Sequence, residues 1–169
     1  ANAQLVDPKP ELTSPSHYYY ENQGQLIDDN GIIREDIKFY TERSTPAMYM
    51  RDEAISFVYQ DVDPVNGNTT SRIDFKFICG GSPEVEEEQC WEIISSEGTE
   101  DYLNYYLPHC SEGITGVKGY ERVVYENAFP GVDFHLYSNQ WGLKSYIVIE
   151  PGVDPGNILF QFEGQDSIE

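Results

Sequence analysis

The feature that most constrains this chain is a succession of short runs of strand-forming residues, which turn-forming residues interrupt along most of its length. Tyr, Phe, Val, Ile and Thr favour strands, whereas Gly, Pro, Asn and Asp favour turns. The strand-like runs lie at residues 17–20, 32–41, 47–50, 54–60, 72–79, 102–107, 120–125, 132–138, 143–149 and 158–162. Nine or ten short strands predict an all-β, β-sandwich-like fold with mostly antiparallel strands and little helix.

Alternation of side-chain type is clearest in the run at 72–79. One predicted face carries Ile73, Phe75, Phe77 and Cys79. The opposite face carries Arg72, Asp74 and Lys76. A period of two is typical of a strand that is buried on one side only. The runs at 47–50 and 54–60, separated by three residues, are interpreted as a hairpin.

Two other stretches need a separate interpretation. Residues 1–16 contain Pro8, Pro10 and Pro15 among polar residues, so they are interpreted as an extended leader before a single β-domain at 17–169. Segment 83–96 is the only one that could hide a helix, and its acidic run favours a solvated loop beside Trp91.

The charge and the first residues bear on location and partners. The formal net charge of −20 repels phosphate backbones and anionic lipids, so we expect neither nucleic-acid binding nor binding to a lipid surface. Residues 1–4 resemble the small-x-small end of a signal peptide, with cleavage before Ala1 or after Ala3. Because no apolar run approaches the length of a membrane helix, we expect export without membrane insertion, to the extracellular space or the cell surface.

The chain has three cysteines, an odd number that cannot form a closed disulfide framework. In an exported protein one bridge is expected. A bridge between Cys79 and Cys90 closes the shortest loop, and one between Cys90 and Cys110 is the alternative. The Cys-x₂-Cys spacing of zinc sites is absent from the sequence.

Searches for catalytic patterns lead to the expectation that the chain is not an enzyme and has no cofactor. The sequence has no Gly-x-Ser-x-Gly elbow, no phosphate-binding Walker loop and no His-Glu-x-x-His motif. The loop from Asp61 begins like a calcium loop, but its glycine comes late at Gly67 and its twelfth position is Arg72. A looser calcium site at 61–68 or 28–30 stays open, although turn formation explains both loops without a metal.

Aromatic side chains give a stronger indication of a binding surface. The run at 102–106 has more tyrosines than one inward face can accommodate, which makes Tyr102, Tyr105 and Tyr106 candidate binding residues, together with Trp141. Surplus aromatic rings on an outer face are typical of carbohydrate- or protein-binding surfaces. The alternative is that a second layer or a neighbouring domain covers them.

Several motifs, taken together, are similar to those of a known family. They are Glu-Asn-Gln-Gly-Gln at 21–25, Asn-Tyr-Tyr at 104–106, Phe-Pro-Gly-Val-Asp at 129–133 and Pro-Gly-Val-Asp-Pro at 151–155. Over residues 18–166 the chain resembles the N-terminal β-domain of unknown function of large Bacteroidetes cell-surface proteins, which are exported by type nine secretion. The motif residues have structural roles in turns and corners, because none is a nucleophile or an acid–base pair. They are Asn22, Gly24, Pro130, Gly131, Pro151 and Gly152.

The resemblance carries two further expectations about the C-terminal end. Relatives continue with further strands beyond the position of Glu169, so we expect the domain to be truncated there and to have an unpaired sheet edge. Asp166-Ser167-Ile168 fits the short pattern used for O-glycosylation of exported Bacteroidetes proteins, which makes Ser167 a candidate modification site.

The leading functional hypothesis is a non-catalytic module of an exported cell-surface protein that acts in adhesion, surface assembly or gliding. Its partners would be other domains of a longer chain, another surface protein, or glycans. One alternative is a carbohydrate-binding module attached to a secreted enzyme. Others are a structural subunit of a filament or secretion complex, and a hydrolase whose acidic pair the sequence does not reveal.

Overall fold

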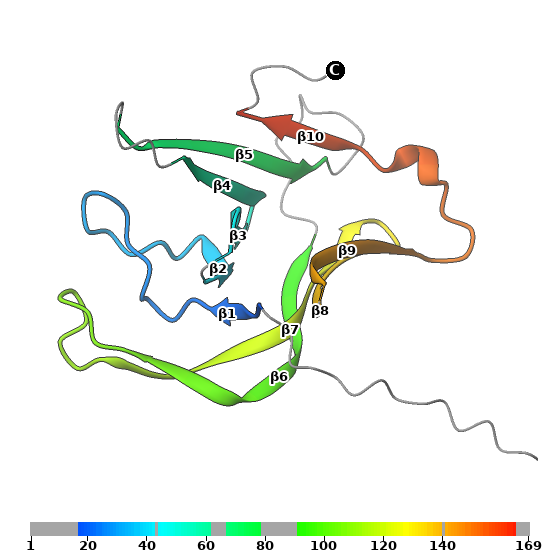
Figure 1. The fold of residues 1–169 in the computed structure, drawn as a ribbon. Coiled ribbons are helices and arrows are strands. Elements are labelled where there is room, and N and C mark those ends of the chain that lie inside the picture. Colours follow the sequence, from blue (N-terminus) through cyan, green and yellow to red (C-terminus); the bar gives the residue numbers. More distant parts are fainter. Residues whose placement is uncertain (1–16, 43, 62–66, 79–90, 140, 165–169) are drawn as a thin grey trace, which may run out of the picture.

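The computed structural model describes residues 17–42, 44–61, 67–78, 91–139 and 141–164, and within them nearly all regular structure is β-strand (Figure 1). The strands are β1 (Tyr19–Glu21), β2 (Ile37–Thr41), β3 (Ala47–Arg51), β4 (Ile55–Asp61), β5 (Thr69–Phe77), β6 (Glu92–Tyr105), β7 (Ile114–Phe129), β8 (Val132–Asn139), β9 (Gly142–Ile149) and β10 (Phe160–Glu163). One short 3₁₀ helix, η2 (Pro155–Asn157), precedes β10. The predicted all-β fold is therefore confirmed.

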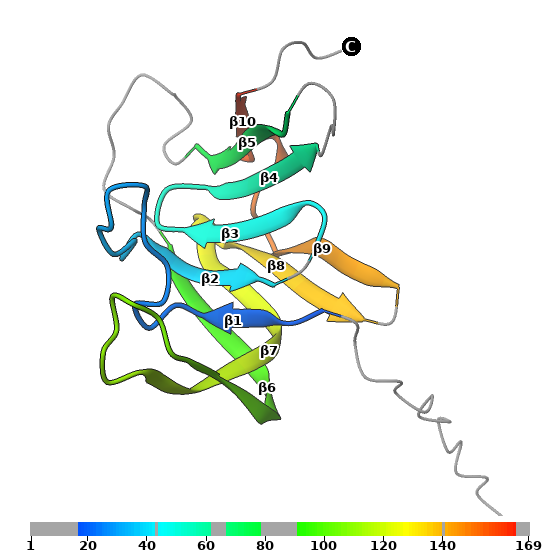
Figure 2. The ribbon, with the colours of Figure 1, turned by 60° about the vertical axis from the view of Figure 1, so that its left-hand side comes forward.

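All ten strands belong to one antiparallel sheet, which curls so that its two halves face each other. The strand order is β10-β5-β4-β3-β2-β1-β7-β8-β9, and β6 pairs with β7 on the other edge of β7. Figure 2 shows β1 to β5 side by side in one half, with β8 and β9 behind them. The arrangement is sandwich-like, but it is built from a single continuous sheet whose end strands, β9 and β10, do not pair with each other.

Strand β7 connects the two halves because it has two different neighbours along one edge. Its residues Gly119 and Tyr120 pair with β1, whereas the stretch from Arg122 to Phe129 pairs with β8. Its opposite edge pairs with β6 from Glu126 back to Ile114. The long β6–β7 hairpin therefore supports both halves of the curled sheet.

The core lies between the two halves and is rich in aromatic rings. Phe77 of β5 is its centre, since its ring lies 5.0 Å from that of Tyr125 on β7 and 5.2 Å from that of Phe134 on β8, measured between centroids. Phe77 also contacts the rings of Phe75, Trp91, Phe129 and Phe160. Contacts of this kind add to the free energy of apolar burial and explain why the two halves stay together.

Several predicted elements agree with the structure. The hairpin predicted at 47–50 and 54–60 is formed by β3 and β4, which pair from Ala47↔Val58 to Met50↔Ile55. On β5 the predicted alternation is present, because Phe77 is buried in the core whereas Arg72 is exposed. Cys79 lies outside the described residues.

Other predicted boundaries were wrong, and the interpretation of segment 83–96 was wrong in part. Residues 92–96 are not a loop but the start of β6, which continues to Tyr105. The strand was missed because Ser95, Ser96 and Gly98 have little strand preference, although Ile93 packs against the core. In contrast, the run predicted at 32–41 forms a strand only from Ile37. Residues 83–90 lie outside the described residues.

Candidate functional site

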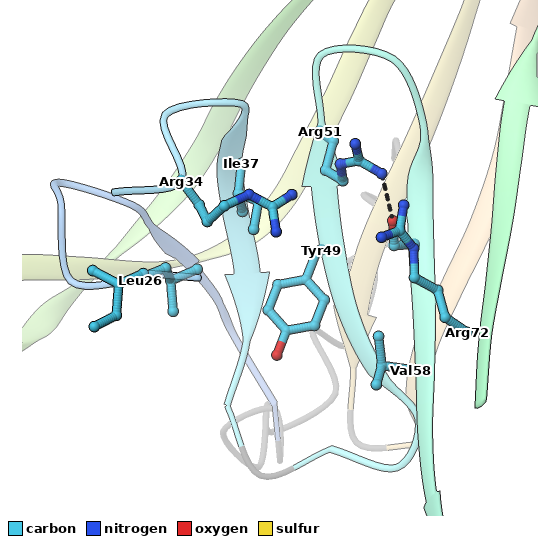
Figure 3. A pocket seen from close by; sticks show the side chains of 9 residues that line it. Leu26, Arg34, Ile37, Tyr49, Arg51, Val58 and Arg72 are labelled. Atoms are coloured by element: carbon cyan, nitrogen blue, oxygen red, sulfur yellow. Dashed lines mark hydrogen bonds between the residues drawn. The ribbon is translucent and has the colours of Figure 1, made fainter. Parts of the chain in front are cut away.

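The most distinctive site lies on the outer face of β2 to β5, opposite the core. It is a pocket of about 180 Å³ lined by Leu26, Ile27, Arg34, Ile37, Tyr49, Arg51, Ser56, Val58 and Arg72. We call it the arginine pocket, because three of the chain's ten basic residues line it. In Figure 3 the guanidinium groups of Arg34, Arg51 and Arg72 converge from three separate segments beside the ring of Tyr49.

Strand alternation and pairing bring these residues to one face. Tyr49 of β3 is opposite Ser56 of β4, which is in turn opposite Asp74 of β5. Val58 and Arg72 form the next cross-strand pair on the same face. Because side chains of directly paired residues point to the same side of a sheet, residues distant in sequence become neighbours in the pocket.

The loop between β1 and β2 forms one wall of the pocket, and Asn22 fixes the shape of that loop. Its Nδ2 donates hydrogen bonds to the carbonyl oxygens of Arg34 (2.7 Å) and Ile37 (2.9 Å). Its Oδ1 accepts one from the backbone N–H of Gly24 (3.2 Å). Gly24 has φ of 105°, a conformation that favours glycine. These two motif residues thus hold the loop that carries Leu26, Ile27 and Arg34.

A shift in strand pairing completes the wall. The register between β2 and β3 changes between Ile37 and Phe39. Phe39 faces the core opposite Met50, whereas Ile37 pairs with Arg51 and lines the outer pocket. A bulge of this kind redirects a side chain that regular alternation would send to the other face.

The three arginines and two aspartates form a continuous chain of ion pairs. Arg34 Nε and Arg51 Nε donate to Asp36, at 2.7 Å and 2.9 Å respectively. Arg51 Nη1 lies 3.5 Å from Asp74 Oδ2, and Arg72 Nε donates to Asp74 Oδ1 at 2.7 Å. Arg51 is the central member and has a side chain only 15% exposed. The order Arg34, Asp36, Arg51, Asp74, Arg72 alternates in sign and has a net charge of +1.

This network controls the protonation of its acidic members. Hydrogen bonds from Arg34, opposed by partial burial and aided by Arg51, hold the pKa of Asp36 well below its usual range. Burial alone would raise the pKa of Asp74, but hydrogen bonds from Arg72 and Ser56, with the nearby positive charges, outweigh it and lower the pKa. Both carboxyl groups are therefore ionised at neutral pH.

A second concave surface lies on the inner side of the same strands, at the open end of the curled sheet. It is an apolar groove of about 290 Å³, which we call the seam groove. Its lining comes from both halves of the sheet: Met48, Ile55, Phe57, Phe75, Phe134, Leu136, Leu143, Lys144, Ser145 and Phe162. Because β9 and β10 do not pair with each other, each presents an edge beside this groove that no other strand of the described residues pairs with.

Apolar side chains are exposed on both edge strands. Ile147 and Val148 of β9 are 39% and 44% exposed, and Phe160 and Phe162 of β10 are 39% and 45% exposed. Lys144 lines the groove on the β9 side. An apolar groove between two unpaired edges is the geometry that accepts an added strand.

The four aromatic residues predicted as binding residues differ in their exposure and contacts. Tyr105 is half-buried and donates to Glu42 Oε1 (2.5 Å), and its hydroxyl lies 2.7 Å from that of Tyr40. Tyr102, Tyr106 and Trp141 are 61%, 77% and 76% exposed. Within the described part of the chain, no hydrogen bond or ring contact joins Trp141 to the three tyrosines.

The remaining motif residues form turns. Pro130 and Gly131 connect β7 to β8, and Gly131 has φ of 71°. A side chain at Gly131 would lie 2.8 Å from Val153, so the turn and the segment after β9 fit closely. Pro151 and Gly152 form the turn after β9, where Gly152 has φ of 96°.

The cysteine and glycosylation predictions fall largely outside the described residues. Cys79, Cys90 and Ser167 all lie there. Cys110 has a free thiol, so the alternative bridge between Cys90 and Cys110 does not agree with the structure.

Two features of the structure concern metal binding. No group of three or more His, Cys, Asp or Glu residues in the described ranges is placed to hold a metal ion. In the loop at 28–30, Asp28 Oδ1 accepts hydrogen bonds from the backbone N–H of Asn30 (2.9 Å) and Ile32 (2.8 Å). No helix among the described residues is long and apolar enough to cross a membrane.

Comparison with known proteins identifies the family. The model of a domain of unknown function, DUF7948, matches residues 19–169. The chain belongs to this family. No curated protein and no solved structure matches the chain.

Sequence reasoning missed the arginine pocket, although the chain contains a signal for it. Arg34 precedes Asp36 by two positions, and Arg72 precedes Asp74 by the same spacing. On an extended backbone residues two apart share a face, so each pair predicts a local ion pair. What the sequence did not reveal was that Arg51 lies between them.

Proposed function

We propose that this DUF7948 domain is a non-catalytic binding module of an exported cell-surface protein, and that it assembles with its partner by strand addition at the seam groove. The partner would be a neighbouring domain of a longer chain or another surface protein, and the role would be adhesion, surface assembly or gliding. The observation that carries the proposal is the apolar groove between the unpaired edges of β9 and β10.

Three features support this proposal. Backbone N–H and C=O groups of an edge strand are available for pairing, and the groove offers room for alternate side chains of an added strand. The exposed apolar residues of the inner face, Ile147 on β9 and Phe160 and Phe162 on β10, gain free energy when covered. An edge left uncovered in this way is prone to aggregation, so a partner that covers it has a structural benefit.

The test is a selection of binding peptides from a displayed random library. We expect the selected peptides to carry apolar residues at alternate positions. A synthetic peptide of this kind should protect backbone amides of β9 or β10 from hydrogen exchange. Ser145→Lys, which places a charge inside the groove, should weaken its binding by about tenfold or more.

Val148→Lys is the matched control. It adds the same charge to the same exposed strand, but Val148 pairs with Asp133 on the face away from the core. Its effect on peptide affinity should be small. Equal loss in the two variants, or protection confined to strands other than β9 and β10, would contradict strand addition at the seam.

A second candidate function, carbohydrate binding, is favoured by the strong exposure of Tyr102, Tyr106 and Trp141. Exposed aromatic rings stack on the apolar faces of sugars. Binding to a glycan array that is lost in Tyr102→Ala or Trp141→Ala, but kept in Ser145→Lys, would favour this function over strand addition. If the unmodified domain binds no glycan, carbohydrate binding is excluded as its function.

A further inference from the structure

We propose that the arginine pocket is a binding site for a carboxylate group that has an apolar substituent beside it. The inference does not depend on strand addition at the seam groove, because the arginine pocket lies on the opposite face of β4 and β5. Three properties of the pocket lead to it: its charge balance, its free hydrogen-bond donors and its apolar wall.

The charge balance favours a ligand with one negative charge. Arg34, Arg51 and Arg72 outnumber the two carboxylates that pair with them, Asp36 and Asp74. Asp28 attracts Arg34 more weakly and forms no ion pair with it in the described part of the chain. One positive charge thus remains in a protein whose formal net charge is −20. A monoanion neutralises it, whereas a dianionic phosphate would leave a negative excess close to two buried or partly buried aspartates.

Unused donors surround the pocket. The hydrogen bonds to Asp36, Asp74 and Ser56 engage Nε and one Nη of each arginine. Among the described residues, Arg34 Nη1, Arg51 Nη2 and Arg72 Nη1 have no acceptor. Guanidinium N–H groups in a fixed plane suit the two oxygens of a carboxylate, and such charge-assisted bonds are stronger than neutral ones.

The other side chains that line the pocket determine which substituent the bound carboxylate can carry. Leu26, Ile27 and Val58 are aliphatic, and the ring of Tyr49 lies beside the guanidinium groups. These side chains would cover an aliphatic or aromatic substituent. The C-terminal residue of a peptide, when its side chain is apolar, has this combination of groups, and so does a free small carboxylic acid.

The arginines are also held ready for a ligand. Asp36 and Asp74 fix the planes of the guanidinium groups, so little side-chain freedom remains to be lost on binding. The Asn22 bonds fix the loop that carries Arg34. A site that is already ordered needs fewer contacts to bind a small ligand.

The experiment is an NMR titration of the ¹⁵N-labelled domain with N-acetyl-leucine, which has one carboxylate and one apolar side chain. We expect shifts in the backbone amides of residues 26, 27, 34, 49, 51 and 72 and in the arginine Nε–H signals. N-acetyl-leucinamide, which lacks the charge, should cause no shifts there, and inorganic phosphate should bind more weakly. A peptide ending in leucine, compared with its amidated form, separates a peptide terminus from a free acid as the source of the carboxylate.

Arg72→Gln is the diagnostic variant, because Arg72 is 45% exposed and Asp74 keeps Arg51 as a partner. Affinity for N-acetyl-leucine should fall about tenfold, as expected for the loss of one charge-assisted hydrogen bond. Arg122→Gln is the matched control, since Arg122 pairs with Glu97 on β6 and lies outside the pocket. It should leave the affinity unchanged. If Arg72→Gln impairs folding, Arg34→Gln provides the same test.

Two results would overturn the inference. One is a titration in which N-acetyl-leucine and N-acetyl-leucinamide shift the same signals equally. The other is an equal loss of affinity in Arg72→Gln and Arg122→Gln. Either would mean that the arginine network only stabilises the outer face of the sheet.

Discussion

The two faces of β4 and β5 show how differently one pair of strands is used. On the inner face Ile55, Phe57 and Phe75 line the seam groove, whereas on the outer face Ser56, Val58 and Arg72 line the arginine pocket. On the inner face no strand among the described residues lies between β9 and β10, whereas on the outer face the loop between β1 and β2 forms one wall of the arginine pocket. Binding at the seam groove would therefore depend on shape and apolar area, and binding at the arginine pocket on charge.

The largest loss of stability should come from a substitution at the centre of the inner face. Phe77→Ala removes the ring on which both halves of the sheet converge, and should lower the free energy of unfolding by about 3–5 kcal/mol. Phe162→Ala, at the exposed edge of the same face, should cost less than about 2 kcal/mol. Urea unfolding monitored by tyrosine and tryptophan fluorescence measures both. Equal losses of stability in the two variants would mean that the side chains of the seam groove contribute as much as the core.

On the outer face, the guanidinium group of Arg51 should contribute most to stability. Arg51→Met leaves Asp36 and Asp74 with one arginine each, and should lower the free energy of unfolding by about 1–3 kcal/mol, the cost of losing hydrogen bonds to charged groups. Arg122→Met, which removes a more exposed ion pair with Glu97, should cost less than about 1 kcal/mol. Urea unfolding at neutral pH gives the comparison, and a larger loss for Arg122→Met would show that the outer network is not stabilising.

Acid should weaken the outer face before it affects the apolar inner face. The folded-state pKa values of Asp36 and Asp74 are lowered, so their contribution to stability is complete above the unfolded value of about 4. It is lost as the pH falls through the folded-state values. The free energy of unfolding should therefore decrease below about pH 4. Asp36→Asn should reduce that decrease, whereas Glu100→Gln, an exposed carboxylate outside the network, should not.

The smallest expected change in stability is the difference between two buried tyrosines of the inner face, Tyr19 and Tyr125. The Tyr19 hydroxyl is buried and has no hydrogen-bond partner among the described residues, whereas the Tyr125 hydroxyl donates to the carbonyl of Arg51 (3.3 Å). Tyr19→Phe should leave stability unchanged or raise it by about 1 kcal/mol, because an unpaired hydroxyl is no longer buried. Tyr125→Phe should lower stability by about 1 kcal/mol. Thermal unfolding of both variants measures the difference, and a loss of stability in Tyr19→Phe would reveal a missing partner.

Much of the strand pattern was predictable because local signals determine it. The hairpin at 47–60 has runs of strand-forming residues on both sides of a short polar turn, and the structure forms it as predicted. Strand β6 was recognised only in part, because Ser95, Ser96 and Gly98 have little strand preference and are held by pairing with β7. Pairing between distant segments has no local signature, so the curl of the sheet was not predictable.

The candidate site was less predictable than the fold. The aromatic residues were chosen because they are numerous, and Tyr105 instead uses its hydroxyl in a bond to Glu42. The arginine pocket depends on the register of four strands and on the bulge beside Ile37, which the sequence does not encode as a motif. The two Arg-x-Asp pairs were visible, but their convergence on Arg51 required the pairing of β3, β4 and β5.

The position of β7 has a consequence for how the chain acquires its structure. Strand β1 pairs with β2 on one edge, but its other edge pairs with β7, where Tyr19 lies opposite Tyr120, about a hundred residues later in the chain. Pairings at such separation slow folding, because the long intervening chain must first be ordered. Strands β1 to β5 can associate early as hairpins, but the connection of β1 to the other half forms only when β7 is present. A break in the chain within β7 would therefore prevent both halves from reaching their final form.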